Sequence, residues 1–335
     1  MRIKAIGLLS GGLDSALALK VIQDMGVEVV AVKFTSPFIQ SNPNDHAAQV
    51  ARDLGIELVR IPLGDDALAV IRHPKHGYGS AINPCIDCHA FMLRKAREYM
   101  EEIGASFLIT GEVLNQRPMS QHRKALDTVE KDAGVEGLLV RPLSAKNLPP
   151  TIPEKNGWID REKLFAMDGR TRRPQIELAA KTGVKGYASA GGGCLLTERS
   201  YASRLRDLFR NKPDAAMRDL DILSVGRHYR IGADKAICGK DKSECKSLRA
   251  VAKTGDWIFD PTSDKGALVL LQKCADAAAE SSDSAESFDF AARLASAYCD
   301  GDSETVTISA QQKDGETREL RVPRAKRDDF KNRKL

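Results

Sequence analysis

The sequence predicts an α/β fold, a parallel sheet with helices on both faces, followed by a smaller α+β domain. In the first part of the chain, short apolar runs alternate with runs that have helical spacing, as in βαβ units. From residue 221 onward, short strand-like runs alternate with turn residues, which is typical of antiparallel strands. We therefore expect two domains, residues 1–215 and residues 221–335.

The elements of the first domain follow from this pattern. We expect parallel strands at 3–9, 27–34, 57–61, 107–110 and 137–140, and helices at 16–22, 47–54, 90–103, 175–182 and 200–210. In the second domain we expect strands at 229–231, 236–238, 257–259, 267–271, 306–309 and 319–322. Residues 276–286 are rich in Ala, Ser and acidic residues, which predicts an exposed loop or joint.

A glycine-rich turn stands between the first predicted strand and the first predicted helix, with the sequence Ser10-Gly11-Gly12-Leu13-Asp14-Ser15. Paired glycines let an anion approach the backbone, and the start of the following helix supplies free N–H groups and a positive dipole. The turn lacks a Gly-Lys-Ser/Thr ending, so a P-loop is a poor match. A glycine-rich turn without a ligand is the alternative, but the position favours phosphate binding.

Two further segments should meet this turn. Parallel sheets bind ligands beyond the carboxyl ends of their strands. Residues 33–37 and 110–116 follow the second and fourth predicted strands. We therefore expect Lys33, Thr110 and Gly111 to lie near the nucleotide.

Cysteines mark a second candidate site. Cys85 and Cys88 form a Cys-x-x-Cys before a predicted helix, and Cys194 follows the glycine-rich run 189–193. Three thiolates suit a 4Fe–4S cluster with one open iron, whereas the pair Cys88 and Cys194 would suit persulfide and disulfide chemistry. Zinc would need further ligands at an unsuitable spacing, and buried unreactive thiols remain the plain alternative. The remaining cysteines are expected to be packing residues: Cys238, Cys245, Cys274 and Cys299.

Composition bounds the class of protein. The chain has 335 residues, a net charge of +5 and seven cysteines, an odd number that argues against a secreted disulfide framework. No signal peptide or membrane span is evident in the sequence, so we expect a cytoplasmic location. A density of basic residues predicts contact with RNA phosphates, and it comprises Arg199, Arg204, Arg206, Arg210, Lys212, Arg227, Arg230, Lys235, Lys240, Lys242, Lys246, Arg249, Arg318, Arg321, Arg324, Lys326 and Arg327.

The glycine-rich hexapeptide resembles the signature of the PP-loop ATP pyrophosphatases, whose fold is of the adenine nucleotide α-hydrolase type. That resemblance implies cleavage of ATP between its α and β phosphates to adenylate a substrate. Ser10, Gly11, Gly12 and Ser15 would then hold the pyrophosphate, with Asp14 near Mg²⁺.

Within that superfamily, residues 1 to about 210 resemble the tRNA sulfurtransferases. Residues 110–116, Thr-Gly-Glu-Val-Leu-Asn-Gln, with Ser120-Gln121 and Arg141-Pro142-Leu143, are similar to segments of the 4-thiouridine synthases. Asn83-Pro84-Cys85-x-x-Cys88 is more similar to the 2-thiouridylases, and Cys194 falls where both groups carry a second cysteine. Residues 221 to about 325 resemble the NFACT-R domain, a proposed RNA-binding module, through short motifs at 225–227, 254–257 and 266–268.

The resemblance implies ATP-dependent thiolation of a tRNA uridine, with position 8 as the preferred site. Expected cofactors are ATP, Mg²⁺ and a 4Fe–4S cluster, and expected partners are tRNA, an external sulfur donor (sulfide, a cysteine desulfurase or a persulfide carrier) and a second copy in a homodimer. No THUMP domain precedes and no rhodanese-like domain follows in this sequence, so sulfur should come from elsewhere. The alternatives are a non-catalytic RNA-binding protein and an amidating or nitrile-forming synthetase.

The expected site residues can be grouped by role. The nucleotide-binding residues are Ser10, Gly11, Gly12, Asp14, Ser15, Lys33, Thr110 and Gly111. The catalytic residues are Asp14, Cys85, Cys88 and Cys194, and the three cysteines are also the metal ligands.

Overall fold

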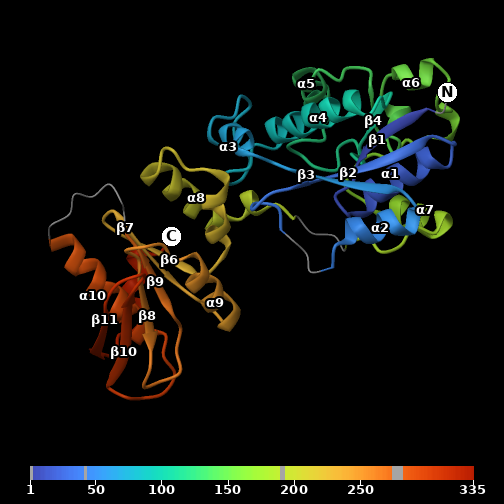
Figure 1. The fold of residues 1–335 in the computed structure, drawn as a ribbon. Coiled ribbons are helices and arrows are strands. Elements are labelled where there is room, and N and C mark those ends of the chain that lie inside the picture. Colours follow the sequence, from blue (N-terminus) through green and yellow to red (C-terminus); the bar gives the residue numbers. More distant parts are fainter. Residues whose placement is uncertain (1–2, 41–43, 189–192, 274–281) are drawn as a thin grey trace. The chain divides into compact units, whose positions relative to one another are not determined.

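The computed structural model describes residues 3–40, 44–188, 193–273 and 282–335 and divides the chain into two compact units, Met1–Glu198 and Arg199–Leu335 (Figure 1). Each unit has a sheet and an apolar core of its own. The glycine-rich turn and the three candidate site cysteines all belong to the first unit.

The first unit is built on a parallel five-stranded sheet in the order β3-β2-β1-β4-β5. Its strands are β1 (Lys4–Leu8), β2 (Glu28–Thr35), β3 (Glu57–Pro62), β4 (Phe107–Ile109) and β5 (Leu139–Val140). The central strands are apolar because both faces are covered, and Ala5, Ile6 and Leu108 are fully buried. The predicted fold class is confirmed for this unit.

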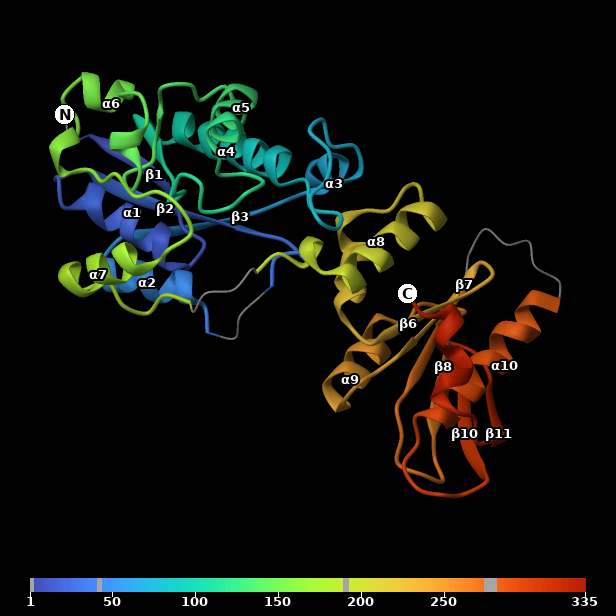
Figure 2. The ribbon, with the colours of Figure 1, turned by 180° about the vertical axis from the view of Figure 1, so that it is seen from behind.

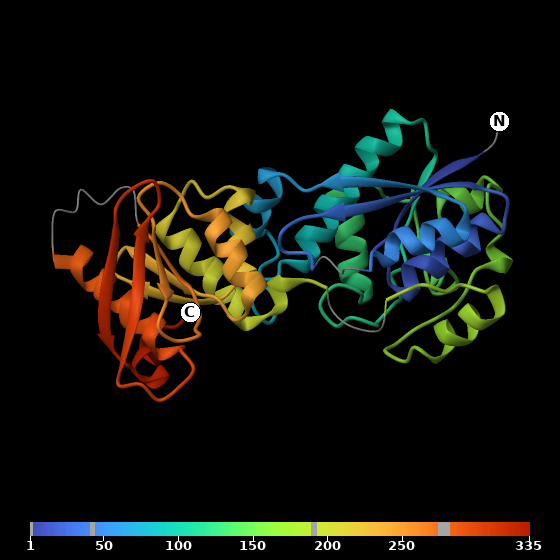
Figure 3. The ribbon, with the colours of Figure 1, turned by 60° about the horizontal axis from the view of Figure 1, so that its bottom comes forward.

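Helices cover both faces of this sheet (Figures 1 and 3). They are α1 (Leu13–Gln23), α2 (His46–Leu54), α3 (Asp65–Arg72), α4 (Cys85–Glu102), α5 (Arg123–Ala133), α6 (Ile152–Lys155) and α7 (Arg173–Thr182). On one face α1 contacts α7, and on the other α4 contacts α3 and α5. The order β1–α1 and the central position of β1 place the glycine-rich turn at the carboxyl edge of the sheet.

The second unit is built on a six-stranded antiparallel sheet in the order β11-β10-β8-β9-β7-β6 (Figure 2). Its strands are β6 (Arg227–Ile231), β7 (Asp234–Cys238), β8 (Trp257–Pro261), β9 (Val269–Gln272), β10 (Thr305–Gln312) and β11 (Thr317–Pro323). Its helices are α8 (Arg199–Asn211), α9 (Lys242–Val251) and α10 (Ser282–Ala297), and α10 packs on the sheet. The predicted α+β second domain is therefore present.

Short 3-10 segments complete the two units: η1 (Ala145–Asn147), η2 (Arg161–Lys163), η3 (Leu195–Thr197), η4 (Met217–Ser224) and η5 (Arg327–Arg333). Of the described residues, no helix is both long and apolar enough to span a membrane.

Two features of the second unit differ from the sequence pattern. Helix α8 lies in the second unit, ahead of the expected boundary at 215–221, because its Arg204 donates to Leu223 O at 2.8 Å and its Asp207 accepts from Arg230. The loop predicted at 276–286 is wrong for 282–286, where α10 has already begun, and residues 276–281 lie outside the described residues. Alanine and the apolar spacing of Phe288, Ala291 and Ala292 favour the helix there.

Candidate functional site

The two serine hydroxyl groups of the glycine-rich turn form hydrogen bonds with the backbone of the turn. Ser15 Oγ donates to Gly12 O at 2.9 Å, and Gly12 N donates to Ser10 Oγ at 3.3 Å. Gly12 is the N-cap of α1 in an extended conformation, and no side chain caps the helix there. The first N–H groups of α1 are thus not satisfied by a capping side chain, which is the arrangement that binds phosphate.

Gly11 needs the conformation that only glycine adopts readily. Its φ is +87°, and a Cβ at this position would stand 2.9 Å from the N atom of Ala47 and 3.1 Å from the Cβ of His46. Gly11 O accepts from Ala188 N at 2.8 Å. The turn is therefore fixed between the start of α2 and residue 188.

Lys33 lies within β2 rather than after it, and its Nζ is 2.7 Å from Asp45 Oδ1. Asp45 is the N-cap of α2 and also pairs with Arg60 at 2.6 Å. Because α2 begins against Gly11, Lys33 is linked to the turn through the Asp45 carboxylate. Lys33 as a nucleotide-binding residue stays a prediction.

The Thr-Gly-Glu segment after β4 packs on the turn. A Cβ on Gly111 would stand 2.4 Å from both Asp14 C and Ser15 N, so only glycine fits this approach of the two backbones. Thr110 is buried, and its Oγ1 donates to Glu112 Oε2 at 3.0 Å. The meeting of residues 110–116 with the turn, predicted from the sheet rule, is thereby confirmed.

The side chain of Asp14 contacts the 110–116 segment where this segment packs on the turn. Its Oδ2 accepts from Gln116 Nε2 at 3.1 Å, while its buried Oδ1 has no hydrogen-bond partner among the described residues. Burial raises the pKa of Asp14, opposed by the Gln116 hydrogen bond and by the charges of Arg172 and Arg117. A buried oxygen with no protein partner beside a phosphate cradle fits a carboxylate that holds Mg²⁺.

Glu112 is the centre of a buried ionic network. Its side chain is 9% exposed, accepts from Arg141 Nε at 2.9 Å and lies 3.1 Å from His89 Nδ1. Arg141 also pairs with Glu130. Burial alone would raise the pKa of Glu112, but the Arg141 charge and the His89 contact outweigh it and hold that pKa well below its usual range. Because His89 follows Cys88 on α4, this network ties the helix of the cysteines to the segment that packs on Asp14.

The cysteine segments are brought together by backbone hydrogen bonds. Cys194 forms an antiparallel bridge with Ile39, just after β2, and Leu195 N donates to Phe38 O at 2.9 Å. Ile82 N, just before Cys85, donates to Leu196 O at 3.2 Å. Residues 189–192 of the glycine-rich run lie outside the described residues.

The three half-buried thiols are electrostatic neighbours. Burial raises the pKa of Cys88, and the nearby Cys194 and Cys85 raise it further. Burial also raises the pKa of Cys194, whereas the Arg117 charge lowers it. The charge of Arg117 also makes a minor contribution at Asp14.

The thiol environment fits metal-bound sulfur. Asn83 Nδ2 donates to Cys85 Sγ at 3.1 Å, a contact that stabilises a thiolate. Within the described ranges, no three side chains converge closely enough to hold a single metal ion. A 4Fe–4S cluster binds each thiolate on a separate iron, so the wider grouping of Cys85, Cys88 and Cys194 is compatible with it.

Sequence reasoning missed several residues of the site. Gln116 and Arg172 act on Asp14, and the buried Nε of Arg172 has no hydrogen-bond partner among the described residues. Arg172 lies at the start of α7, far along the chain from the turn, so no local pattern marked it. The position of Gln116 in the segment after β4 was the available signal.

Several basic residues predicted to face RNA instead stabilise the second unit. Arg204 and Lys235 are buried, and Lys235 and Arg230 both pair with Asp207. Arg324 Nη1 donates to Cys299 O at 2.9 Å. For these four, the prediction of an RNA-facing surface is wrong. The exposed members of the set are Arg199, Arg206, Arg210, Lys240, Lys242, Lys246, Arg249, Arg318, Arg321, Lys326 and Arg327.

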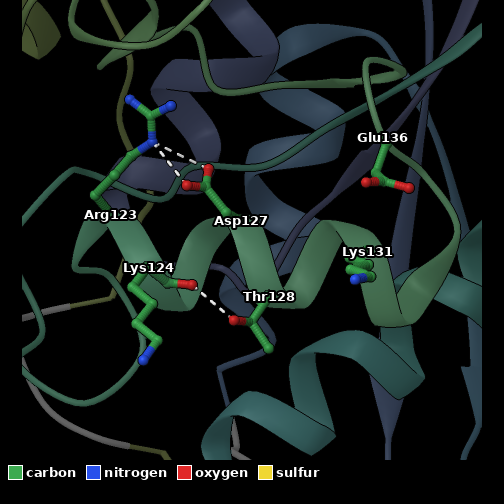
Figure 4. Close-up of a pocket in the computed structure, with 6 residues that line it drawn as sticks. All are labelled: Arg123, Lys124, Asp127, Thr128, Lys131 and Glu136. Atoms are coloured by element: carbon green, nitrogen blue, oxygen red, sulfur yellow. Dashed lines mark hydrogen bonds and ion pairs between the residues drawn. The ribbon is translucent and has the colours of Figure 1, made fainter.

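A hollow of about 490 Å³ on the exposed side of α5 lies apart from the candidate residues (Figure 4). Arg123 Nε donates to both carboxylate oxygens of Asp127 at 3.0 Å, and Thr128 Oγ1 donates to Lys124 O at 2.8 Å. These are i,i+4 contacts along one helix face, and they give the hollow a structural explanation.

Comparison with known proteins finds one family model in each unit. Residues 2–147 match the family model described as thiamine biosynthesis protein (ThiI), and residues 226–333 match the NFACT protein RNA binding domain. A probable tRNA sulfurtransferase of Alkaliphilus metalliredigens is 32% identical over 143 residues, which cover 42% of this chain and 36% of that protein. The resemblance to the PP-loop tRNA sulfurtransferases is confirmed.

Two further curated proteins match the chain. A probable tRNA sulfurtransferase of Brevibacillus brevis is 30% identical over 199 residues, which cover 53% of this chain and 47% of that protein. The tRNA-specific 2-thiouridylase MnmA of Pelobacter propionicus is 32% identical over 115 residues, 31% of each protein. The chain thus spans less than half the length of these curated relatives. A solved 4-thiouridine synthetase–RNA complex with bound ATP is 23% identical and covers 66% of this chain and 52% of its own, with a TM-score of 0.41.

Proposed function

We propose that this chain uses ATP to thiolate a uridine of tRNA, with 4-thiouridine at position 8 as the product. The observation that carries the proposal is the chain of contacts that joins the phosphate turn to the cysteines. Gly111 packs against Asp14, and the next residue, Glu112, contacts His89, which follows Cys88 on α4. An enzyme that activates a carbonyl oxygen and then delivers sulfur needs these two sites side by side.

In the first step, the uridine carbonyl oxygen attacks the α-phosphorus of ATP, and pyrophosphate leaves. The N–H groups at the start of α1, with Ser10 and Ser15, hold the pyrophosphate. The Oδ1 of Asp14 is the protein oxygen available for Mg²⁺, which neutralises charge on the phosphates. The products of this step are an O-adenylated uridine and pyrophosphate.

In the second step, a sulfur nucleophile attacks the activated carbon, and AMP leaves with the former uridine oxygen. Cys85, Cys88 and Cys194 would hold a 4Fe–4S cluster, which when bound supplies an open iron for sulfide. Asn83 fixes Cys85, and the Glu112–His89 contact fixes the first turns of α4 that carry Cys85 and Cys88. Because sulfide is already fully reduced, its transfer needs no reductant. The sulfur donor is external: sulfide itself, or the persulfide of a cysteine desulfurase or carrier, from which a thiol reductant releases sulfide as the thiol is oxidised to a disulfide.

The second unit, which matches an RNA-binding domain, would hold tRNA through its exposed basic residues. We therefore propose that the protein is a cytoplasmic tRNA-modifying enzyme.

The test is anaerobic incubation of the full chain with ATP, Mg²⁺, sulfide and unmodified tRNA, followed by mass spectrometry of the nucleosides. Formation of 4-thiouridine together with AMP and pyrophosphate supports the proposal. Tight tRNA binding without ATP cleavage would instead indicate a non-catalytic RNA-binding protein. Cleavage of ATP with a small molecule and no dependence on tRNA would indicate a synthetase.

A further inference from the structure

A groove in the second unit is lined by residues of α10 and of the edge strand β11, with Trp257 from the start of β8 and Lys273 just after β9. Figures 1 and 2 show these elements as ribbons. The volume of the groove is about 700 Å³, and it includes the aromatic side chains of Trp257 and Phe288 and the cations Lys273, Arg318 and Arg321. This size falls within the range of small-ligand sites, about 300–1,000 Å³. Nothing in the proposed chemistry of the first unit uses this groove.

The most distinctive side chain in the groove is Arg318. Its guanidinium carbon lies 5.2 Å from the ring centre of Trp257 and 5.6 Å from that of Phe288. The two rings meet edge to face, with centres 4.8 Å apart, and Arg318 Nη2 also pairs with Glu316, so the rings and the carboxylate together hold the guanidinium in place. The Arg318 side chain is 51% exposed. The guanidinium is therefore in contact with both rings and with the Glu316 carboxylate, while part of the side chain remains exposed.

The charges around this plane suit a nucleotide better than a bare anion. Arg321 is exposed, and Lys273 pairs with Asp234 at 2.8 Å. Asp289 and Glu319 also line the groove, and carboxylates accept hydrogen bonds from base amino groups and ribose hydroxyls. A phosphate can bind the cations, and a base can stack on an arginine plane.

An extended peptide is the main alternative occupant, since β11 is an edge strand. The strand carries Arg318, Glu319 and Arg321 in close succession and ends at Pro323. Charged side chains and proline are the features by which edge strands avoid pairing with other chains. The groove therefore favours a nucleic acid over an added strand.

We infer that this groove binds one nucleotide of single-stranded RNA, with its base stacked on the Arg318 guanidinium. The inference depends on the proposed function only for the class of ligand, RNA. Because the free ends and loops of an RNA offer unstacked bases and a duplex does not, single strands should bind in preference to duplexes.

Trp257 gives a direct readout of the groove. The chain has two tryptophans, so Trp158→Phe in the full-length protein leaves Trp257 as the sole indole emitter. Decaadenylate and decauridylate are titrated without ATP at fixed salt, while Trp257 fluorescence and the anisotropy of labelled oligonucleotide are recorded. We expect saturable quenching by single strands and at least about tenfold weaker binding of a blunt RNA duplex.

Two substitutions then separate stacking from charge. Arg318→Ala should weaken single-strand binding about tenfold or more. Arg318→Lys keeps the charge but loses the plane, so it should bind nearly as weakly as Arg318→Ala. Arg218→Ala removes an exposed arginine of η4 that lies outside the groove and outside the predicted RNA-facing set, so it is the matched control, expected to bind within about twofold of the parent. Urea unfolding shows whether each variant is folded. If Arg318→Ala does not fold, the binding of Arg318→Lys tests the inference.

Several results would overturn the inference: no quenching by single strands, equal binding of the duplex, full binding by Arg318→Lys, or quenching by an acidic peptide but not by RNA. Each of these readings is independent of ATP and thiolation. The groove can thus fail while the chain still thiolates tRNA, and thiolation can fail while the groove still binds RNA.

Discussion

Gly111 and Asp14 lie with their backbones in direct contact, so that a Cβ on Gly111 would stand 2.4 Å from Asp14 C and 2.6 Å from Asp14 O. The contact joins the segment after β4 to the first turn of α1. Glu112 is the next residue along the chain, so the contact also connects the buried ionic network of Glu112 to the glycine-rich turn.

Gly111→Ala should therefore damage both stability and ATP binding. The added methyl meets backbone atoms that cannot rotate away, and overpacking of this kind costs about 1 to 3 kcal/mol. Urea unfolding and ATP titration measure the two effects. Gly193→Ala is the control, because a Cβ there meets nothing within 4 Å. Equal behaviour of the two variants would contradict the assigned contact.

Asp14→Ala should abolish ATP cleavage without loss of stability. Burial raises the pKa of Asp14, so the ionised carboxylate is disfavoured in the fold and its removal costs little or stabilises the protein slightly. We expect pyrophosphate release to fall by at least about 100-fold, because the Mg²⁺ ligand is lost. Release at the wild-type rate, or a large drop in unfolding free energy, would show that Asp14 is a structural residue.

Cys85, Cys88 and Cys194 should each be essential for thiolation and for iron binding. Replacement of any one by Ser should remove nearly all bound iron and its brown absorption in anaerobic protein, because three ligands leave none to spare. Cys245→Ser, a half-buried thiol of the second unit, is the matched control and should keep both. Colourless, iron-free protein that thiolates tRNA with a persulfide donor would instead point to the pair Cys88 and Cys194.

Glu112→Gln should lower the free energy of unfolding by about 3 kcal/mol, because it removes one partner of the buried Arg141. The pKa of Glu112 is lowered in the fold, so its contribution is present above the ordinary carboxyl pKa of about 4.3 and is lost as pH falls through the lower native value. The difference between wild type and variant should be constant from pH 7 to 5 and shrink below about pH 4. Exposed Glu136→Gln should show no such difference. A difference in unfolding free energy that stays constant down to the pH of acid unfolding would contradict the assigned Glu112–Arg141 ion pair.

The sequence was sufficient to predict what depends on local pattern. The strand-turn-helix around Gly12, the parallel sheet and the meeting of residues 110–116 with the turn all follow from apolar spacing and the order of elements. The effect of Arg172 on Asp14, and the burial of Arg204 and Lys235, depend on tertiary contacts between distant segments. A basic residue looks the same in sequence whether it faces solvent or a buried Asp207, so charge density alone overestimated the RNA-facing surface.

The central claim is that ATP activates the uridine carbonyl oxygen itself, and the fate of that oxygen tests it most directly. Unmodified tRNA carrying ¹⁸O at the uridine 4-carbonyl is incubated with the protein, ATP, Mg²⁺ and sulfide, and the AMP is analysed by mass spectrometry. If the adenylated uridine is displaced by sulfur, each 4-thiouridine formed should be matched by one AMP that contains ¹⁸O in its phosphate. Unlabelled AMP, or ADP with inorganic phosphate, would contradict the proposed mechanism.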